Sequence, residues 1–145
     1  MNKTVNEFLE RNLPKFKDDI NISLCQGKKD FFKIDCAGNK LNISANNCIS
    51  AFHGLYEYLK KYCNVQLSWC GNRNIEIDSL KMFDGVFSKT TEQKYRVYLN
   101  YCTLDYSMCW WDFEKWEKEI DFMAMNGINM TLAVIGSEAV LYETL

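Results

Sequence analysis

Residues 95–143, with the sequence YRVYLNYCTLDYSMCWWDFEKWEKEIDFMAMNGINMTLAVIGSEAVLYE, decide the fold of this chain. They read as a strand, a helix, a second strand and the start of another helix, and the pattern then stops. Parallel strands joined by a crossover helix are normally buried on both faces and need further neighbours. We therefore expect this stretch to open a larger fold, in which functional groups lie on loops from several strands.

The local signals within this stretch are specific. Residues 95–103 are rich in β-forming side chains and predict a buried strand. Asp112 is a suitable N-cap for a helix, and Gly127 falls where a left-handed C-terminal cap is needed. The residues expected to face inward from this helix are Phe113, Trp116, Ile120, Met123 and Ala124. A second apolar strand over 128–134 would complete a βαβ unit, the building block of parallel barrels.

The first half of the chain predicts a separate α+β unit that begins with a short amphipathic helix. Its apolar residues recur at helical spacing, with Thr4 as a cap and Glu7 completing a capping box. Segments 20–25, 31–36 and 40–44 then alternate apolar and polar residues, which predicts strands joined by hairpins into an antiparallel sheet.

A second helix is predicted to cover that sheet, capped by the Ala45-Asn46-Asn47 stretch and ending near Cys63. Residues 65–69 would form a short strand, and a second short strand over 75–80 is expected to pair back on the sheet. Residues 82–94 show no sustained period and predict a link. We place the boundary near Ser88, which gives domains 1–88 and 89–145.

Composition restricts the function. The chain has 145 residues, 17 basic and 19 acidic side chains and no basic face, which argues against nucleic-acid binding. No signal peptide or membrane-spanning run is visible. If Met1 is the native start, we expect a cytosolic chain.

Neither a metal site nor a cofactor is predicted. The cysteine count is seven, an odd number, and no pair has CxxC spacing. Most of these cysteines are interpreted as small, reduced core residues. The single histidine, His53, lies on the expected second helix, where a structural role is favoured over catalysis.

The order of residues in the last third resembles a known family. Segments 95–103, 110–112, 116–121 and 123–129 are similar to the opening of the catalytic barrel in α-N-acetylglucosaminidases, the family 89 glycoside hydrolases. The first half, including FHGLYEYLKKYCN (52–64), resembles the N-terminal domain of that family more loosely. The implied fold is an α+β N-terminal domain followed by the first βαβ of a truncated (β/α)8 barrel.

The resemblance also implies a function. The family removes terminal α-linked N-acetylglucosamine with retention, which requires two carboxyl groups about 5 Å apart. The two family glutamates lie beyond this chain, so no catalytic residue is assigned here and the chain alone is expected to be inactive. The implied partner is an N-acetylglucosamine-containing glycan, and family members are often lysosomal or secreted.

The resemblance assigns substrate-binding positions to this chain at the ends of the two barrel strands. They are Asn100, Cys102, Gly136 and Glu138. Asn100 and Cys102 match side chains that face the sugar, although an asparagine that fastens the strand end and a packed thiol would fit the same pattern. Glu138 orients substrate or another side chain, or else it favours the positive end of a helix.

The chain departs from the family after the second strand. Ile135 and Ser137 stand where the family usually has a tryptophan and a glutamine, so sugar stacking or hydrogen bonding at this loop is in doubt. Trp116 is interpreted as a core residue. One of Trp110 and Trp111 is expected to be exposed at the edge of the cleft.

A non-catalytic role is the alternative. A chain that ends here would be a truncated module that binds a glycan or a partner protein through the exposed barrel edge. Such an edge and an apolar helix face predict self-association.

Overall fold

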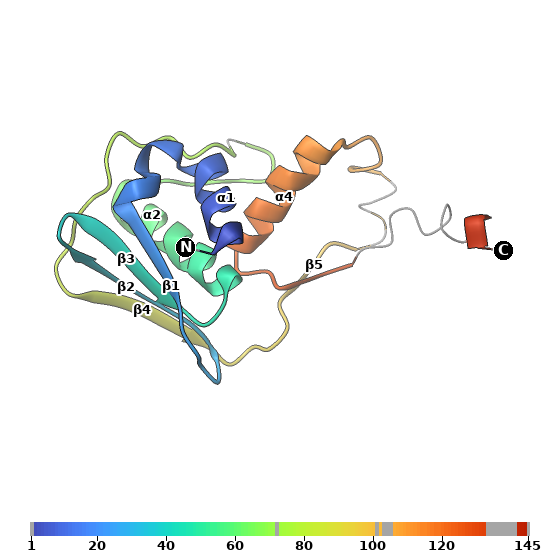
Figure 1. Ribbon diagram of the computed structural model, residues 1–145. Helices are drawn as coiled ribbons and strands as arrows, with labels where there is room; N and C mark the ends of the chain where they lie inside the picture. Colours follow the sequence, from blue (N-terminus) through green and yellow to red (C-terminus); the bar gives the residue numbers. More distant parts are fainter. Residues whose placement is uncertain (1, 72, 101, 103–105, 133–141, 145) are drawn as a thin grey trace.

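The computed structural model describes residues 2–71, 73–100, 102, 106–132 and 142–144 (Figure 1). Its elements, in chain order, are α1 (Lys3–Asn12), the 3-10 helix η1 (Pro14–Asp19), β1 (Ile20–Leu24), β2 (Asp30–Ala37), β3 (Lys40–Ala45), α2 (Cys48–Cys63), β4 (Val86–Thr91), β5 (Val97–Tyr98), α4 (Phe113–Met125) and β6 (Met130–Thr131). We call 2–91 the sheet unit and 96–132 the βαβ unit.

Helix α1 begins earlier than its sequence pattern predicts. The side chain of Asn2 accepts a hydrogen bond from the Thr4 amide at 3.0 Å, so Asn2 is the N-cap and Thr4 lies in the first turn. The prediction of a Thr4 cap was wrong because Asn2 offers an equally good acceptor two residues earlier. The apolar face is as expected, and the ring of Phe8 stacks on that of Phe52 on α2 with centroids 3.8 Å apart.

The sheet is mixed rather than antiparallel. Its strand order is β1-β3-β2-β4, with β1 parallel to β3 and the other neighbours antiparallel. Gly38 and Asn39 both have positive φ, and they close a tight hairpin that pairs β2 with β3 at once. Strand β1 therefore takes the free edge of β3, and the predicted β1–β2 hairpin does not form.

The alternation of residues along the strands correctly predicts which face is buried. Phe32, Ile34, Leu41 and Ile43 are buried beneath α2. On the opposite face the Asn21 amide donates to Asn42, which in turn donates to Asp35 on β2. The sheet thus has one apolar and one polar face, as the period of two requires.

The fourth strand lies inside the segment that we predicted to be a link. Strand β4 pairs with β2 along its whole length, from Asp30↔Thr91 to Asp35↔Val86, and it runs through the predicted boundary near Ser88. Its residues are mostly exposed, as in an edge strand, so the apolar pattern is weak. The division into two domains remains a prediction.

The two strands predicted over 65–69 and 75–80 are absent from the described residues of that region. Val65 and Leu67 are buried, but the Leu67 amide donates to the hydroxyl of Tyr56, and that hydroxyl donates to the Leu67 carbonyl. The Tyr56 side chain of α2 thus takes the place of a neighbouring strand as the hydrogen-bond partner of Leu67. The alternating apolar residues therefore predicted correctly that side chains of this region are buried. They predicted wrongly that the region pairs as strands.

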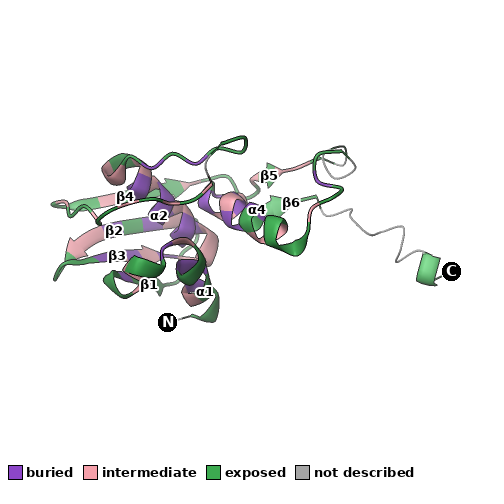
Figure 2. Ribbon diagram, turned by 90° about the horizontal axis from the view of Figure 1, so that it is seen from above, coloured by how far each residue is buried: buried purple, intermediate pink, exposed green. Residues whose placement is uncertain are grey.

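The two units share one core (Figure 2). Met125, at the end of α4, belongs to the same buried cluster as Leu55 of α2 and Leu9 of α1, and Phe122 packs against it. Helix α4 lies against α2, as Figure 1 shows. The described helices include none that is both long and apolar enough to cross a membrane.

The βαβ unit is confirmed as a parallel pair joined by a helix. Val97 pairs with Met130 and Tyr98 with Thr131. Asp112 caps α4 by accepting from the Lys115 amide, and Gly127, at φ 74°, ends the helix as predicted. The described residues form no closed barrel, so the barrel opening remains a prediction.

The inward stripe predicted for α4 was partly wrong. Met123 is buried, but Phe113 is 77% exposed and Ile120 is 53% exposed. Beside Met123, the helix instead buries Glu119 and Asp121 against the sheet unit, because arginines there pair with both carboxylates. The strand β5 is also less buried than predicted, with Val97 60% exposed.

Candidate functional site

The strand-end residues predicted to contact a sugar lie at the carboxyl end of β5. The strand ends at Tyr98, Leu99 follows with φ 69°, and Asn100 and Cys102 are both exposed. A non-glycine residue in the left-handed region turns the chain sharply. The thiol of Cys102 does not pack against the described residues, and its role in binding remains a prediction. Gly136 and Glu138 lie outside the described residues.

Side chains from both units meet beside this strand end. Arg73 Nη1 lies 2.6 Å from Oε2 of Glu119 on α4, and Glu119 is fully buried. This contact is an ion pair without an aligned hydrogen bond, because neither carboxylate oxygen of Glu119 has a hydrogen-bond partner among the described residues. Burial raises the pKa of Tyr98, the Glu119 carboxylate raises it further, and the Arg73 cation opposes this shift.

One of Trp110 and Trp111 is exposed, as predicted, but the prediction that Trp116 is a core residue was wrong. Trp110 is 90% exposed, while Trp111 is half-buried and packs edge-on against Trp116 with ring centroids 5.5 Å apart. Trp69, from the sheet unit, lies 6.3 Å from Trp111 between centroids. Trp116 is only half-buried, so it belongs to an aromatic cluster at the junction rather than to the main core.

A second contact joins the two units through another carboxylate of α4. The guanidinium of Arg11 donates two hydrogen bonds to Asp121, at 2.9 and 2.8 Å, and the Asn12 amide donates a third at 2.7 Å. A two-pronged arginine–carboxylate pair fixes orientation as well as distance. Both contacts run from the sheet unit to carboxylates of α4.

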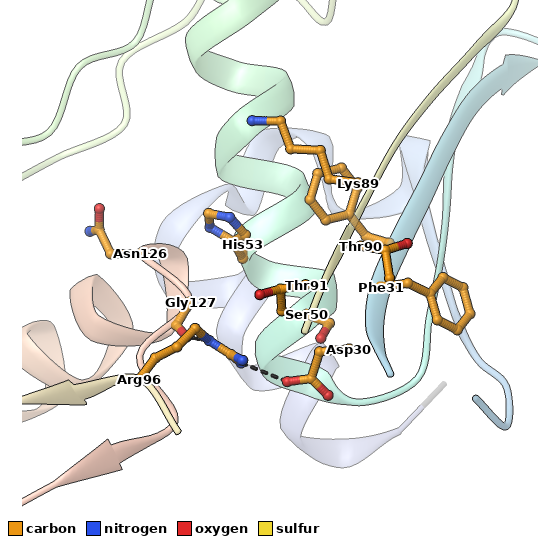
Figure 3. A pocket seen from close by; sticks show the side chains of 11 residues that line it. Asp30, Phe31, Ser50, His53, Lys89, Thr90, Thr91, Arg96, Asn126 and Gly127 are labelled. Atoms are coloured by element: carbon orange, nitrogen blue, oxygen red, sulfur yellow. Dashed lines mark hydrogen bonds and ion pairs between the residues drawn. The ribbon is translucent and has the colours of Figure 1, made fainter. Parts of the chain in front are cut away.

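A pocket of about 170 Å³ lies where the βαβ unit meets β2, β4 and α2 (Figure 3). Arg96 reaches across it and donates to Asp30 at 2.6 Å, to the Gly127 carbonyl and to the Gln93 carbonyl. Burial would raise the pKa of Asp30, but hydrogen bonds from Asn46, Arg96 and Asn47 outweigh it and lower this pKa below its ordinary value.

His53 lies on the same pocket wall and performs a structural task. Its Nδ1 is 2.9 Å from the carbonyl of Met125, so this nitrogen carries the proton and donates. A Cβ on Gly127 would come within 3.3 Å of the imidazole ring. The pocket is smaller than typical ligand sites, and its charged groups bind one another, so we interpret it as a joint between the units.

Among the residues that the structure describes, no three His, Cys, Asp or Glu side chains come together in a way that could hold a metal ion.

Sequence reasoning missed the arginine–carboxylate contacts. Arg73 lies between the strands predicted over 65–69 and 75–80, and Glu119 and Asp121 lie in a helix whose apolar residues defined the expected inward face. The available signal was the position of Glu119 four residues before Met123, which places an acid on the same face as a residue expected to point inward. A periodicity argument based on apolar residues alone does not detect it.

Comparison with known proteins agrees with this geometry. Residues 3–80 match the α-N-acetylglucosaminidase N-terminal domain, and residues 96–145 match the TIM-barrel domain of the same enzymes. Human α-N-acetylglucosaminidase is 38% identical over 101 residues, which cover 70% of this chain and 14% of the human protein.

Two solved structures are also similar. The family 89 glycoside hydrolase from Clostridium perfringens in complex with 2-acetamido-1,2-dideoxynojirmycin has a TM-score of 0.89 and 31% identity, over 97% of this chain and 16% of that one. A variant of the same bacterium's enzyme, in complex with its substrate GlcNAc-α-1,4-galactose, has a TM-score of 0.90 at the same identity and coverage.

The class defined by these matches is that of glycoside hydrolases. The chain belongs to the α-N-acetylglucosaminidase family, family 89, and corresponds to the N-terminal part of its members. It spans about a sixth of the length of the relatives that it matches.

Proposed function

We propose that this chain provides one wall of the sugar pocket of an exo-glycosidase that removes terminal α-linked N-acetylglucosamine from glycans with retention. One observation carries the proposal: in a chain of this family, Asn100 and Cys102 are exposed together where β5 ends. In parallel barrels, that end of the strands forms the active-site face. An amide offers both a donor and an acceptor to sugar hydroxyls.

The chain by itself is proposed to be inactive. Retaining chemistry requires an acid/base carboxyl group and a nucleophilic carboxylate on opposite sides of the scissile bond. Among the described residues, the two buried carboxylates of α4 are paired with arginines of the sheet unit. The proposed contribution of this chain is therefore recognition of the sugar, with both catalytic groups supplied from outside it.

The first test is the intact mass of the natural product in its host, followed by hydrolysis of an aryl α-N-acetylglucosaminide. We expect a longer species that hydrolyses this substrate and a 17.0 kDa chain that does not. In the longer species, Asn100→Ala should lower kcat/KM by about 10-fold to 100-fold, the effect of losing one or two hydrogen bonds to substrate. Asn6→Ala, on α1, is the matched control and should leave the rate unchanged. Equal rates for the two variants would contradict the proposal.

A second candidate function rests on the exposed apolar residues of the βαβ unit. They are Val97, Phe113, Ile120 and Met130. If the natural product has a mass of 17.0 kDa, this face would bind a glycan or a partner protein without catalysis. Light scattering of the purified 145-residue chain distinguishes the readings: self-association that Ile120→Ser abolishes supports the binding role, and a stable monomer argues against it.

A further inference from the structure

The pairing of β5 with β6 is too short to fix its own register. It joins only Val97 to Met130 and Tyr98 to Thr131. Because side chains alternate between the two faces of a strand, a shift by one residue would turn every side chain of β5 to the opposite face. A pair of strands this short is marginal by itself, so contacts outside the ladder must hold β5 in place.

Arg96, which directly precedes β5, is bonded to the segment before β6 through both its main chain and its side chain. Its amide donates to the side chain of Asn129 at 2.8 Å, and its carbonyl accepts from the amides of Asn129 and Met130 at 3.2 and 3.3 Å. The Asn129 side chain donates to the Lys94 carbonyl at 2.9 Å, and the Arg96 side chain donates to the Gly127 carbonyl. These bonds align the residue before β5 with the residue before β6.

The same guanidinium ties the start of β5 to the sheet unit (Figure 3). Its Nη2 donates to Asp30, the first residue of β2, at 2.6 Å, and both side chains are mostly buried. Hydrogen bonds between ionised partners are stronger than neutral ones. The other oxygen of Asp30 accepts from the side-chain amides of Asn46 and Asn47, just before α2. Arg96 is therefore anchored to a carboxylate that is itself held in place.

We propose that Arg96 is a positioning residue for sugar recognition: anchored by Asp30, it fixes the register of β5 against β6 and hence the place of the strand end that carries Asn100. Asn100 follows the last residue of β5 by two positions, so a slip of one residue would carry it along the strand by about 3.3 Å. This inference rests on the proposed function for its biological meaning, whereas the register itself does not depend on that function.

The first experiment measures the register by NMR in the 145-residue chain, where NOEs between backbone protons of the paired residues report the β5–β6 pairing. We expect both Arg96→Met and Asp30→Asn to abolish these NOEs. In Asp30→Asn, the new amide oxygen can still accept from Asn46 and Asn47, while its nitrogen presents a second donor to Arg96. This variant thus removes one bond with little other change, and it keeps the test valid if Arg96→Met does not fold.

Arg11→Met is the matched control, because it breaks the other arginine–carboxylate tie between the units, the pair with Asp121, and contacts neither β5 nor β6. The β5–β6 NOEs should persist in this variant. Unchanged NOEs in the Asp30 and Arg96 variants would overturn the proposal. An equal loss in the Arg11 variant would overturn it as well, because the pairing would then depend on any attachment between the units.

The second experiment tests the recognition role in the longer species that hydrolyses the aryl substrate. Asp30→Asn should raise KM by about 3-fold to 10-fold and leave kcat nearly unchanged, because a displaced recognition group weakens substrate binding. A variant that only folds less well would show a lower kcat at an unchanged KM, which would overturn the recognition role. If Asn100→Ala leaves hydrolysis intact, the proposed function fails, and the NOEs still decide whether Arg96 sets the register.

Discussion

The sheet unit and the βαβ unit bury different kinds of side chain. The sheet unit places its large apolar residues inside, between α1, α2 and one face of the sheet. The βαβ unit buries two carboxylates against the sheet unit and leaves Phe113, Ile120 and Val97 toward solvent. The first unit therefore supplies most of the shared apolar core. The second is attached through Met125 and ion pairs, and it presents an apolar face that can accept further structure.

The largest expected effect is the difference in stability lost when a side chain is truncated in the core of the sheet unit and on the exposed face of α4. Leu55→Ala should destabilise the chain by about 3 kcal/mol, because Leu55 is fully buried and its loss leaves a cavity. Ile120→Ala should change the free energy of unfolding by no more than about 0.5 kcal/mol. Urea denaturation measures both. Equal losses would mean that the Ile120 face is packed in solution, and the contrast between the units would fail.

The next largest effect concerns the attachment of the βαβ unit. Asp121→Ala should cost about 2–3 kcal/mol, because it removes the acceptor of two hydrogen bonds from Arg11 and one from Asn12 in a partly buried place. Amide hydrogen exchange should accelerate in α4 and remain slow in β2 and β3. Faster exchange throughout the sheet would show that the two units unfold together.

Two glycines distinguish backbone strain from packing at the joint. Gly38→Ala places a Cβ at φ 59° with nothing within 4 Å, so it should cost about 1 kcal/mol. Gly127→Ala adds a close approach to the His53 ring at a similar φ, and it should cost about 1 kcal/mol more. Thermal unfolding of both variants checks the difference. Equal losses of stability in the two variants would mean that the His53 ring moves away from the new Cβ at no cost in free energy.

The smallest effect is a pH dependence within the sheet unit. Burial raises the pKa of Glu57, but hydrogen bonds from Lys60 and Lys89 outweigh it and lower this pKa to about 2. A lowered folded-state pKa stabilises the chain above pH 4.5, and the stabilisation is lost as the pH falls toward 2. Because both lysines are partly exposed, we expect about 1 kcal/mol in all.

Glu57→Gln should flatten the dependence of stability on pH between 4.5 and 2. Glu114→Gln is the matched control: its ion pair with Lys118 is exposed on α4, so the pH profile should keep its slope. A slope that persists in the Glu57 variant would assign the acid sensitivity to another carboxylate.

Local signals predicted the elements better than their pairing. The caps at Asn47, Asp112 and Gly127 were identified because each depends on a few adjacent residues. The neighbour of β1 was not, because alternation defines which face of a strand is buried and says nothing about which strand lies beside it. Strand β4 was missed because an edge strand shows little apolar pattern.

The candidate site was predictable only through resemblance. Composition and spacing could not single out Asn100 or Cys102, since an exposed amide and an exposed thiol are ordinary features of a loop. The contact of Arg73 with Glu119 joins residues far apart in the sequence, so no local window contains it. The left-handed backbone of Leu99 could not be predicted from the sequence, because this conformation is unfavourable for leucine.

The insertion of β3 between β1 and β2 has a consequence for biosynthesis. Strand β1 is made first, but its sheet neighbour in the described structure is β3 alone. On the ribosome, residues 20–24 must therefore wait until residue 45 has emerged before they can pair. Nascent chains arrested before β3 emerges should be cleaved by proteases within β1, whereas longer chains should be protected. The order of synthesis and the order of assembly thus differ at the amino-terminal edge of the sheet.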